Sequence, residues 1–117
     1  MTTIKKIVKR DGRMVEYDVD KIAEAIFKAA QVLGGKDKDM AKYLARQTEL
    51  YLSEILHTST PSVEQIQDAV EKILIENGHA KTAKAYILYR RQHENIRRAK
   101  NTLLDYKALV NNYLKIN

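Results

Sequence analysis

The chain has 117 residues, a length that supports one compact domain, and it carries a formal net charge of +6. Hydrophobic residues make up 44% and charged residues 31%, a globular rather than a disordered composition. The sequence contains no cysteine, which excludes disulfides, thiolate zinc sites and cysteine nucleophiles. No apolar run approaches the roughly 20 residues that span a bilayer, and the N-terminus lacks the apolar stretch of a secretory signal. We expect a soluble cytoplasmic domain with no membrane contact.

The first 17 residues predict a β-hairpin. Residues 4–9 alternate in part and are β-branched, residues 14–17 form a plausible return strand, and Asp11-Gly12 is a strong hairpin signal. The basic residues around this turn are Lys9, Arg10 and Arg13. Such side chains suit a polyphosphate, because lysine offers a mobile charge and arginine a planar fork. The alternative for a basic turn is a solvated surface.

Helical periodicity follows the hairpin. Asp18 or Asp20 can cap a first helix that ends at Gly34-Gly35. A second helix should start near Asp37 and end near Leu56. Its predicted apolar stripe consists of Met40, Tyr43, Leu44, Gln47, Tyr51 and Ile55.

A third helix is predicted after Ser62, because Gln65 stands three residues later and completes a capping box. This helix should end at Asn77-Gly78. A fourth helix should begin near Lys81 and continue through Ile96.

The C-terminal segment predicts a further helix or a bent continuation over residues 103–115, with Thr102 and Asp105 as its cap. It carries an apolar stripe that needs a surface to pack on. The stripe consists of Leu103, Leu104, Tyr106, Leu109, Val110, Tyr113 and Leu114. A boundary cut from a longer protein, a helix returning onto its own domain and a dimer contact all fit this pattern.

The positive charge is concentrated in residues 79–100, which hold seven basic residues against Glu94 alone. Such a segment attracts nucleic acid, phosphates or an acidic protein face, or it forms a solvated helix face. No catalytic constellation accompanies it, since the chain lacks HExxH, GxGxxG, Walker A and a Ser-His-Asp context. We therefore do not expect this chain alone to be an enzyme, and we assign no catalytic residue and no metal ligand.

Three motifs, in order, resemble the ATP-cone family over about residues 4–98. The opening reads IVKRDGR at residues 7–13 and VEYDVDKI at residues 15–22. PSVEQIQDAVE at residues 61–71 is similar to the family's third-helix motif, and KAYILYR at residues 84–90 is similar to its fourth.

The resemblance implies an α+β, mostly α fold, in which an N-terminal hairpin or three-stranded sheet caps a four-helix bundle with an extra C-terminal helix. Residues 1–100 would form the nucleotide-binding domain, and residues 101–117 a helical extension or linker toward a catalytic domain. The family binds ATP or dATP and regulates ribonucleotide reduction. The tail is similar to that of anaerobic, class III ribonucleoside-triphosphate reductases. The implied partners are adenine nucleotides, the reductase's catalytic domain and a second copy of the chain. Mg²⁺ is expected as well, because it usually accompanies triphosphates.

The resemblance also implies ligand contacts. The phosphate-binding positions are Lys9, Arg10, Lys21, Arg90 and Arg91, where the sequence leaves open which of the two late arginines points inward. The adenine- and ribose-binding positions are Glu16, Tyr17, Asp18, Ile22, Ile26, Val63 and Gln67. For Asp18 a helix N-cap is the alternative, and for the two isoleucines a core position. Val63 and Gln67 depart from the hydroxyl or histidine that several reductase cones carry there.

Two other functions stay open. The family also includes the cone of a nucleotide-responsive transcriptional repressor, in which a zinc ribbon precedes the cone. A helical module that contacts nucleic acid or protein through the basic segment is the other alternative, although no recognised DNA-binding motif appears in the sequence.

Overall fold

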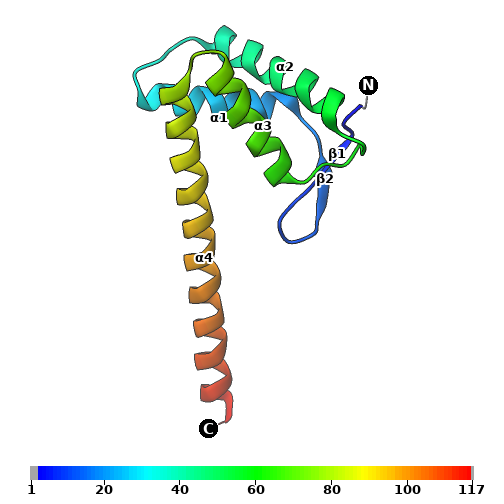
Figure 1. The fold of residues 1–117 in the computed structure, drawn as a ribbon. Coiled ribbons are helices and arrows are strands. Elements are labelled where there is room, and N and C mark those ends of the chain that lie inside the picture. The colour runs from blue at the N-terminus through cyan, green and yellow to red at the C-terminus, as the bar shows by residue number, and fades with distance from the viewer. Residues whose placement is uncertain (1–2, 117) are drawn as a thin grey trace. The chain divides into compact units, whose positions relative to one another are not determined.

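Figure 1 shows the computed structural model, which describes the backbone of residues 3–116 and the side chains of residues 3–100 and 102. The described elements are β1 (Lys6–Val8), β2 (Met14–Glu16), α1 (Val19–Val32), α2 (Lys38–Ile55), α3 (Val63–Glu76) and α4 (Ala80–Ile116). The chain divides into two compact units, Met1–Ile87 and Leu88–Asn117, so that α4 contributes its first two turns to the first unit. This composition confirms the predicted mostly helical α+β class.

The hairpin forms where the sequence predicts it. The paired residues are Lys6 with Glu16, Ile7 with Val15 and Val8 with Met14. The Lys9 N–H donates to the Arg13 carbonyl at 2.7 Å, and the Gly12 N–H donates to the Lys9 carbonyl at 2.9 Å. Gly12 has φ +87°, a conformation that glycine adopts without the steric cost of a Cβ. The loop is therefore a tight turn followed by a left-handed residue.

The segment before α3 lies along the outer edge of β1. Val8 and Ser62 form an isolated parallel bridge, and the Val8 N–H donates to the Pro61 carbonyl at 3.0 Å. Closer to the N-terminus, the Lys5 N–H donates to the Ser59 carbonyl at 2.9 Å. Over the described residues 3–116 the sheet thus has two strands, and one bridge joins it to the start of α3 in place of a third strand.

α1 follows the hairpin directly. Asp18 is its N-cap, and the Asp18 carboxylate accepts from the Asp20 N–H at 2.9 Å. The apolar face of α1 is buried at Ile22, Ile26 and Ala29. The buried face of α1 packs against α2.

The predicted stripe of α2 is wrong in its orientation. Met40, Tyr43 and Ile55 are exposed, and of the predicted residues only Leu44 is buried. The buried side consists of Ala41, Leu44, Ala45, Thr48 and Leu52. The small alanine side chains let α2 approach its neighbours closely, so the core selects them over the larger residues. Thr48 is tolerated there because its hydroxyl donates to the Leu44 carbonyl at 2.9 Å.

α3 begins with the predicted capping box. The Ser62 Oγ accepts from the Gln65 N–H at 3.2 Å, while the Ser62 N–H donates to Gln65 Oε1 at 2.9 Å. The helix ends at its C-cap Asn77, which Gly78 follows with φ +81°. Both ends of the helix therefore follow local sequence signals.

α4 continues without the break expected near Thr102. The Thr102 hydroxyl donates to the Arg98 carbonyl, one turn earlier, at 2.9 Å. A threonine bonded in this way lies inside a helix and does not cap a new one, so the expected separate C-terminal helix is part of α4. The predicted apolar stripe beyond Thr102 lies outside the described side chains.

A single core holds the first unit together. The helices contribute most of it, and the N-terminal segment is attached through the buried Ile4, which precedes β1, and the half-buried Ile7 of β1. Ala83 and Tyr86 bring the start of α4 into the same core.

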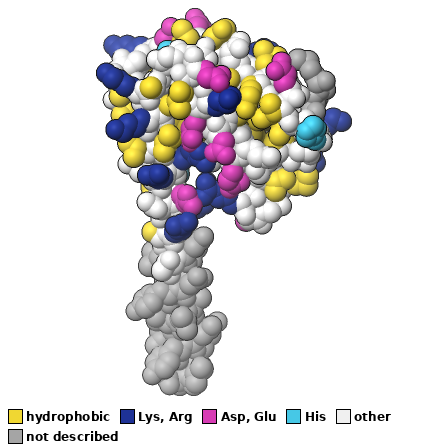
Figure 2. Space-filling view, in the orientation of Figure 1, with side chains coloured by type: hydrophobic (Ala, Val, Ile, Leu, Met, Phe, Trp, Pro, Cys, Tyr) yellow, Lys and Arg dark blue, Asp and Glu magenta, His cyan; other side chains and the backbone are white. Residues whose placement is uncertain are grey.

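In Figure 2 the hydrophobic side chains on this face form several separate groups with charged residues between them. Among the described residues, no helix is long and apolar enough to cross a membrane.

Candidate functional site

The tip of the hairpin carries three basic residues, Lys9, Arg10 and Arg13, around the turn that the sequence predicts. Arg13 is engaged locally, since its Nε lies 2.7 Å from Asp11 Oδ2 and its backbone N–H donates to Asp11 Oδ1 at 3.1 Å. Hydrogen bonds from Arg13 lower the pKa of the Asp11 carboxyl group, and the bond from the Arg13 backbone has the larger effect. The Lys9 and Arg10 side chains take no part in this contact between Arg13 and Asp11.

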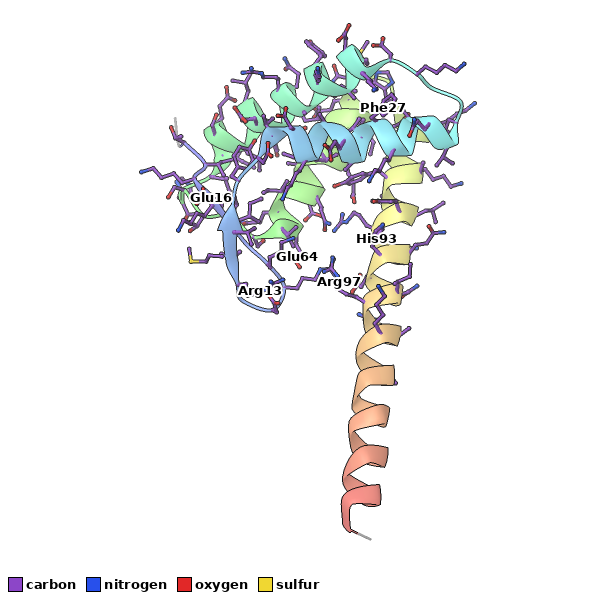
Figure 3. The ribbon with its side chains drawn as sticks, turned by 180° about the vertical axis from the view of Figure 1, so that it is seen from behind. Arg13, Glu16, Phe27, Glu64, His93 and Arg97 are labelled. Atoms are coloured by element: carbon purple, nitrogen blue, oxygen red, sulfur yellow. The ribbon has the colours of Figure 1, made fainter. Side chains whose placement is uncertain are left out.

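Arg10 reaches from the hairpin to the first turn of α3. Its Nε lies 3.0 Å from Glu64 Oε1, with side-chain exposures of 30% for Arg10 and 45% for Glu64. Figure 3 shows Glu64 at the start of α3, next to the hairpin. The sequence motifs alone do not single out Glu64. The available signal was its place as the acidic residue in the first turn of a capped helix.

The backbone explains why these two side chains meet. Val8 and Ser62 are bridge partners in a parallel arrangement, so the chain advances in the same direction from both residues. Arg10 and Glu64 each stand two positions further along. The bridge therefore places the hairpin tip beside the N-terminal turn of α3.

Among the described residues, no carboxylate forms an ion pair with Lys9 or Lys21. Lys9 is half-buried on the hairpin, and Lys21 is exposed in the first turn of α1. Neither ammonium group forms an ion pair with another residue that the structure describes. An anion at this end of the unit would face cations without first displacing an acid from them.

Gln67 lies one turn beyond Val63 on α3, and both residues are half-buried. The Gln67 side-chain oxygen is buried and has no hydrogen-bond partner among the described residues. Buried polar atoms are normally hydrogen-bonded, because desolvation without a partner costs free energy. An unpartnered acceptor beside a cationic region fits a ligand that brings both a hydrogen-bond donor and negative charge, as a nucleotide does.

The other predicted base-binding residues have structural contacts of their own. Glu16 is exposed on β2, opposite Lys6. The Tyr17 hydroxyl donates to Glu49 Oε2 on α2 at 2.6 Å. Burial raises the pKa of the Tyr17 hydroxyl, and this hydrogen bond raises it further. Asp18 caps α1, which is the alternative that the sequence analysis left open.

Ile22 and Ile26 lie in the core, with exposed fractions of 8% and 1%. Arg90 and Arg91 belong to the second unit, where Arg90 is half-buried and Arg91 is exposed. The structure thus brings together the hairpin tip and the start of α3 within the first unit. It describes the late arginines only within α4.

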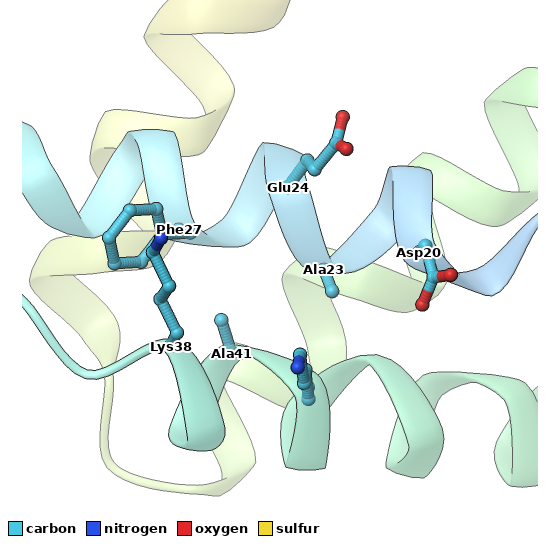
Figure 4. A pocket seen from close by; sticks show the side chains of 7 residues that line it. Asp20, Ala23, Glu24, Phe27, Lys38 and Ala41 are labelled. Carbon is cyan, nitrogen blue, oxygen red and sulfur yellow. The ribbon is translucent and has the colours of Figure 1, made fainter.

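Two of the cavities in the first unit lie between its helices. One, of about 400 Å³, has Asp20 and Glu24 of α1 on one wall and Lys38 and Lys42 of α2 on the other (Figure 4). The Lys38 ammonium lies 5.5 Å from the centre of the Phe27 ring there. The second, of about 280 Å³, is mainly apolar and includes His79. No cluster of three or more acidic or histidine residues that could hold a metal occurs among the described residues.

Comparison with known proteins identifies the domain. The model of the ATP cone domain family matches residues 5–95. A vitamin B12-dependent ribonucleoside-diphosphate reductase of Thermoplasma acidophilum is 42% identical over 106 residues, covering 86% of this chain and 13% of that protein. The reductase of the same name from Mycobacterium tuberculosis is 35% identical over 98 residues, covering 84% of this chain and 14% of that protein.

Anaerobic reductases are also among the relatives, as the sequence predicts. The anaerobic ribonucleoside-triphosphate reductase of Salmonella typhimurium is 35% identical over 88 residues, covering 75% of this chain and 12% of that protein. The chain therefore spans only a small part of the length of the curated relatives it matches, and the likeness extends across more than one kind of reductase. With its hairpin, its capped helices and a family match that covers most of its length, the chain belongs to the ATP cone domain family.

Proposed function

We propose that this chain is an allosteric domain that binds ATP or dATP at its hairpin end and thereby regulates a ribonucleotide reductase. The observation that supports this most is the meeting of the cationic hairpin tip with the first turn of α3, where Arg10 contacts Glu64. The unpartnered oxygen of Gln67 one turn further along α3 gives the same region a free acceptor.

The phosphates would be bound by Lys9 and Arg10 from the hairpin and by Lys21 from the start of α1. Lysine neutralises phosphate as a point charge, and arginine adds paired N–H donors. Arg90 or Arg91 would add a further cation from α4. Mg²⁺ would accompany the triphosphate, because this ion is usually held by phosphate oxygens together with few protein ligands.

The base and ribose would lie toward α3 and the β2–α1 junction. Gln67 Oε1 would accept a hydrogen bond from the adenine amino group or from a ribose hydroxyl. Val63 would contact the ligand's apolar surface, with Ile22 and Ile26 beneath as an apolar floor. Glu16, Tyr17 and Asp18 would border the base, although Tyr17 and Asp18 already have hydrogen-bond partners within the protein.

The reductase assignment is supported by the relatives, which are named as reductases and are far longer than this chain. We propose that residues 1–100 form the nucleotide-binding domain and that residues 101–117 extend toward a catalytic domain. The family match ends within this first segment, at residue 95. Regulation then requires that nucleotide bind one conformation or assembly more tightly than another.

We propose that dATP regulates the reductase by changing its assembly. ATP and dATP differ by one hydroxyl, and a single polar contact supplies only about 1–3 kcal/mol of discrimination. A difference of that size can change activity by shifting an equilibrium between assemblies. A reductase holoenzyme carrying this domain should therefore change mass when dATP replaces ATP, as light scattering would show. An unchanged mass and an unchanged activity would contradict this part of the proposal.

Calorimetric titration tests the nucleotide site itself. We expect micromolar binding of ATP and dATP to this chain with Mg²⁺ present, and much weaker binding of GTP. Lys9→Ala should weaken ATP binding about tenfold, since it removes a charge-assisted contact. Lys36→Ala removes the same charge from the exposed loop between α1 and α2 and should leave affinity nearly unchanged.

The absence of heat with every nucleotide would contradict the proposal. Duplex DNA then becomes the informative ligand, because residues 88–100 of α4 carry five basic residues against Glu94 alone. Tight binding to random DNA that falls steeply with salt would favour a nucleic-acid-binding module instead.

A further inference from the structure

The contact between Arg10 and Glu64 has a consequence for the nucleotide site. Arg10 Nε lies 3.0 Å from Glu64 Oε1, and both side chains are partly shielded from water. A guanidinium binds carboxylate and phosphate oxygens with the same N–H donors. A phosphate group that takes the Nε donor of Arg10 must therefore displace Glu64 from it.

The backbone keeps the two side chains close whether or not they form a pair. The Val8–Ser62 bridge and the hydrogen bond from Val8 to Pro61 fix the hairpin edge against the segment before α3. Loss of the Glu64 charge would not release the hairpin, because these contacts involve only backbone atoms. Arg10 would remain beside α3, and Glu64 would no longer hold its Nε donor.

We propose that Glu64 is an internal competitor for the nucleotide's phosphates: it occupies Arg10 in the ligand-free domain and thereby lowers the affinity for ATP. This inference rests on the proposed nucleotide site. It assigns Glu64, which neither the motifs nor the charge pattern of the sequence singled out, as a residue that sets the affinity of the effector. The consequence is a domain that responds at a higher nucleotide concentration than its cations alone would allow.

The competing possibility is that Glu64 orients Arg10 for phosphate binding. The two roles have opposite signs. A competitor lowers ATP affinity, so its removal strengthens binding, whereas a positioning residue raises affinity, so its removal weakens binding. Glu64→Gln separates them, because glutamine keeps the size of the side chain and loses its charge.

Glu76→Gln is the matched control. It removes the same charge from the same helix, at the opposite end of α3, where Glu76 pairs with Lys72 at 3.2 Å. At a rise of about 1.5 Å per residue, the two glutamates stand roughly 18 Å apart along the helix, beyond the Debye length of about 8 Å at physiological salt. A general effect of net charge would therefore show in both variants, and competition for Arg10 only in Glu64→Gln.

The experiment is calorimetric titration of the wild-type chain and both variants with ATP and with AMP. We expect Glu64→Gln to tighten ATP binding about threefold, as suits the release of a partly exposed ion pair. AMP, which lacks the β and γ phosphates, should gain less. When Arg10 is already replaced by glutamine, Glu64→Gln should change ATP affinity little, because the guanidinium for which Glu64 and phosphate compete is gone. Thermal unfolding of each variant verifies that it is folded.

The outcomes separate this inference from the proposed function. If wild type binds ATP and Glu64→Gln binds equally or more weakly, Glu64 is not a competitor and the nucleotide site stands. An equal gain in Glu76→Gln would likewise overturn the inference, because it would reduce the effect to net charge. If neither wild type nor Glu64→Gln binds ATP, both proposals are wrong.

Discussion

The Tyr17 hydroxyl donates a 2.6 Å hydrogen bond to Glu49 Oε2, which links the β2–α1 junction to α2. The two residues are far apart in sequence, and both are half-buried. The contact holds the start of α1, which carries Asp18 and Lys21, against the adjacent helix. It therefore stabilises the frame of the candidate site without itself requiring a ligand.

Replacement of Tyr17 by phenylalanine should lower the free energy of unfolding by about 1 kcal/mol. The ring would still pack, but the hydrogen bond to a carboxylate would be lost, and partial exposure keeps that loss at the low end. Tyr43→Phe on the exposed side of α2 is the control, because the Tyr43 residue is 52% exposed. Urea unfolding measures both. Equal effects of the two substitutions would show that the Tyr17–Glu49 bond adds nothing.

The same contact predicts a pH dependence. The pKa of Tyr17 is raised above its ordinary value of 10.0 by burial and by Glu49. Above that pH the unfolded chain loses the phenolic proton while the folded chain keeps it, so stability should fall as pH rises beyond about 10.

Urea unfolding of wild type and Tyr17→Phe between about pH 9 and pH 11 isolates this effect. Lys72, whose pKa is raised by Glu76, adds a loss of the same sign, but that loss is common to both proteins. We expect the smaller decline in Tyr17→Phe. Parallel declines would contradict the assigned shift.

The capping box at α3 supports the hairpin edge as well as the helix. Ser62→Ala removes the acceptor of the Gln65 N–H and should cost about 1 kcal/mol, or roughly 4 °C in melting temperature. Ser53→Ala on α2 is the control, since the Ser53 hydroxyl only donates to the Leu50 carbonyl. A thermal melt that shifts equally for both variants would remove the special role of Ser62.

Gln67 should show a trade-off between stability and binding. Gln67→Met keeps the length of the side chain and removes a buried acceptor that has no partner among the described residues. We expect the free domain to gain about 1 kcal/mol in stability, while ATP binding weakens. Gln47→Met on α2 makes the same chemical change elsewhere. A variant that is less stable than wild type, or that binds ATP unchanged, would contradict the assigned role of Gln67.

The parts of the fold that sequence predicts correctly depend on neighbours within about four positions. The Asp11-Gly12 turn, the Asp18 cap and the Ser62–Gln65 capping box are signals of this kind. Each satisfies backbone groups locally, so tertiary packing has little reason to override it.

The features that sequence misses depend on packing between segments. Ala41 and Ala45 are buried in α2 because their small side chains let the neighbouring helices approach closely. The predicted stripe was instead based on larger residues such as Tyr43, which is exposed. The pairing of Arg10 with Glu64 follows from the Val8–Ser62 bridge, which no local motif indicates. The expected break at Thr102 failed because a threonine hydroxyl can bond back into its own helix as well as cap a new one.

The location of the ligand is the central claim, and amide chemical shifts of the isotope-labelled chain test it most directly. On titration with ATP and Mg²⁺, we expect the largest chemical-shift changes at Lys9, Arg10, Lys21 and Gln67. Lys38 and Lys42, in the cavity between α1 and α2, should show little change. Chemical-shift changes concentrated in that cavity, or none at the hairpin and the start of α3, would contradict the account.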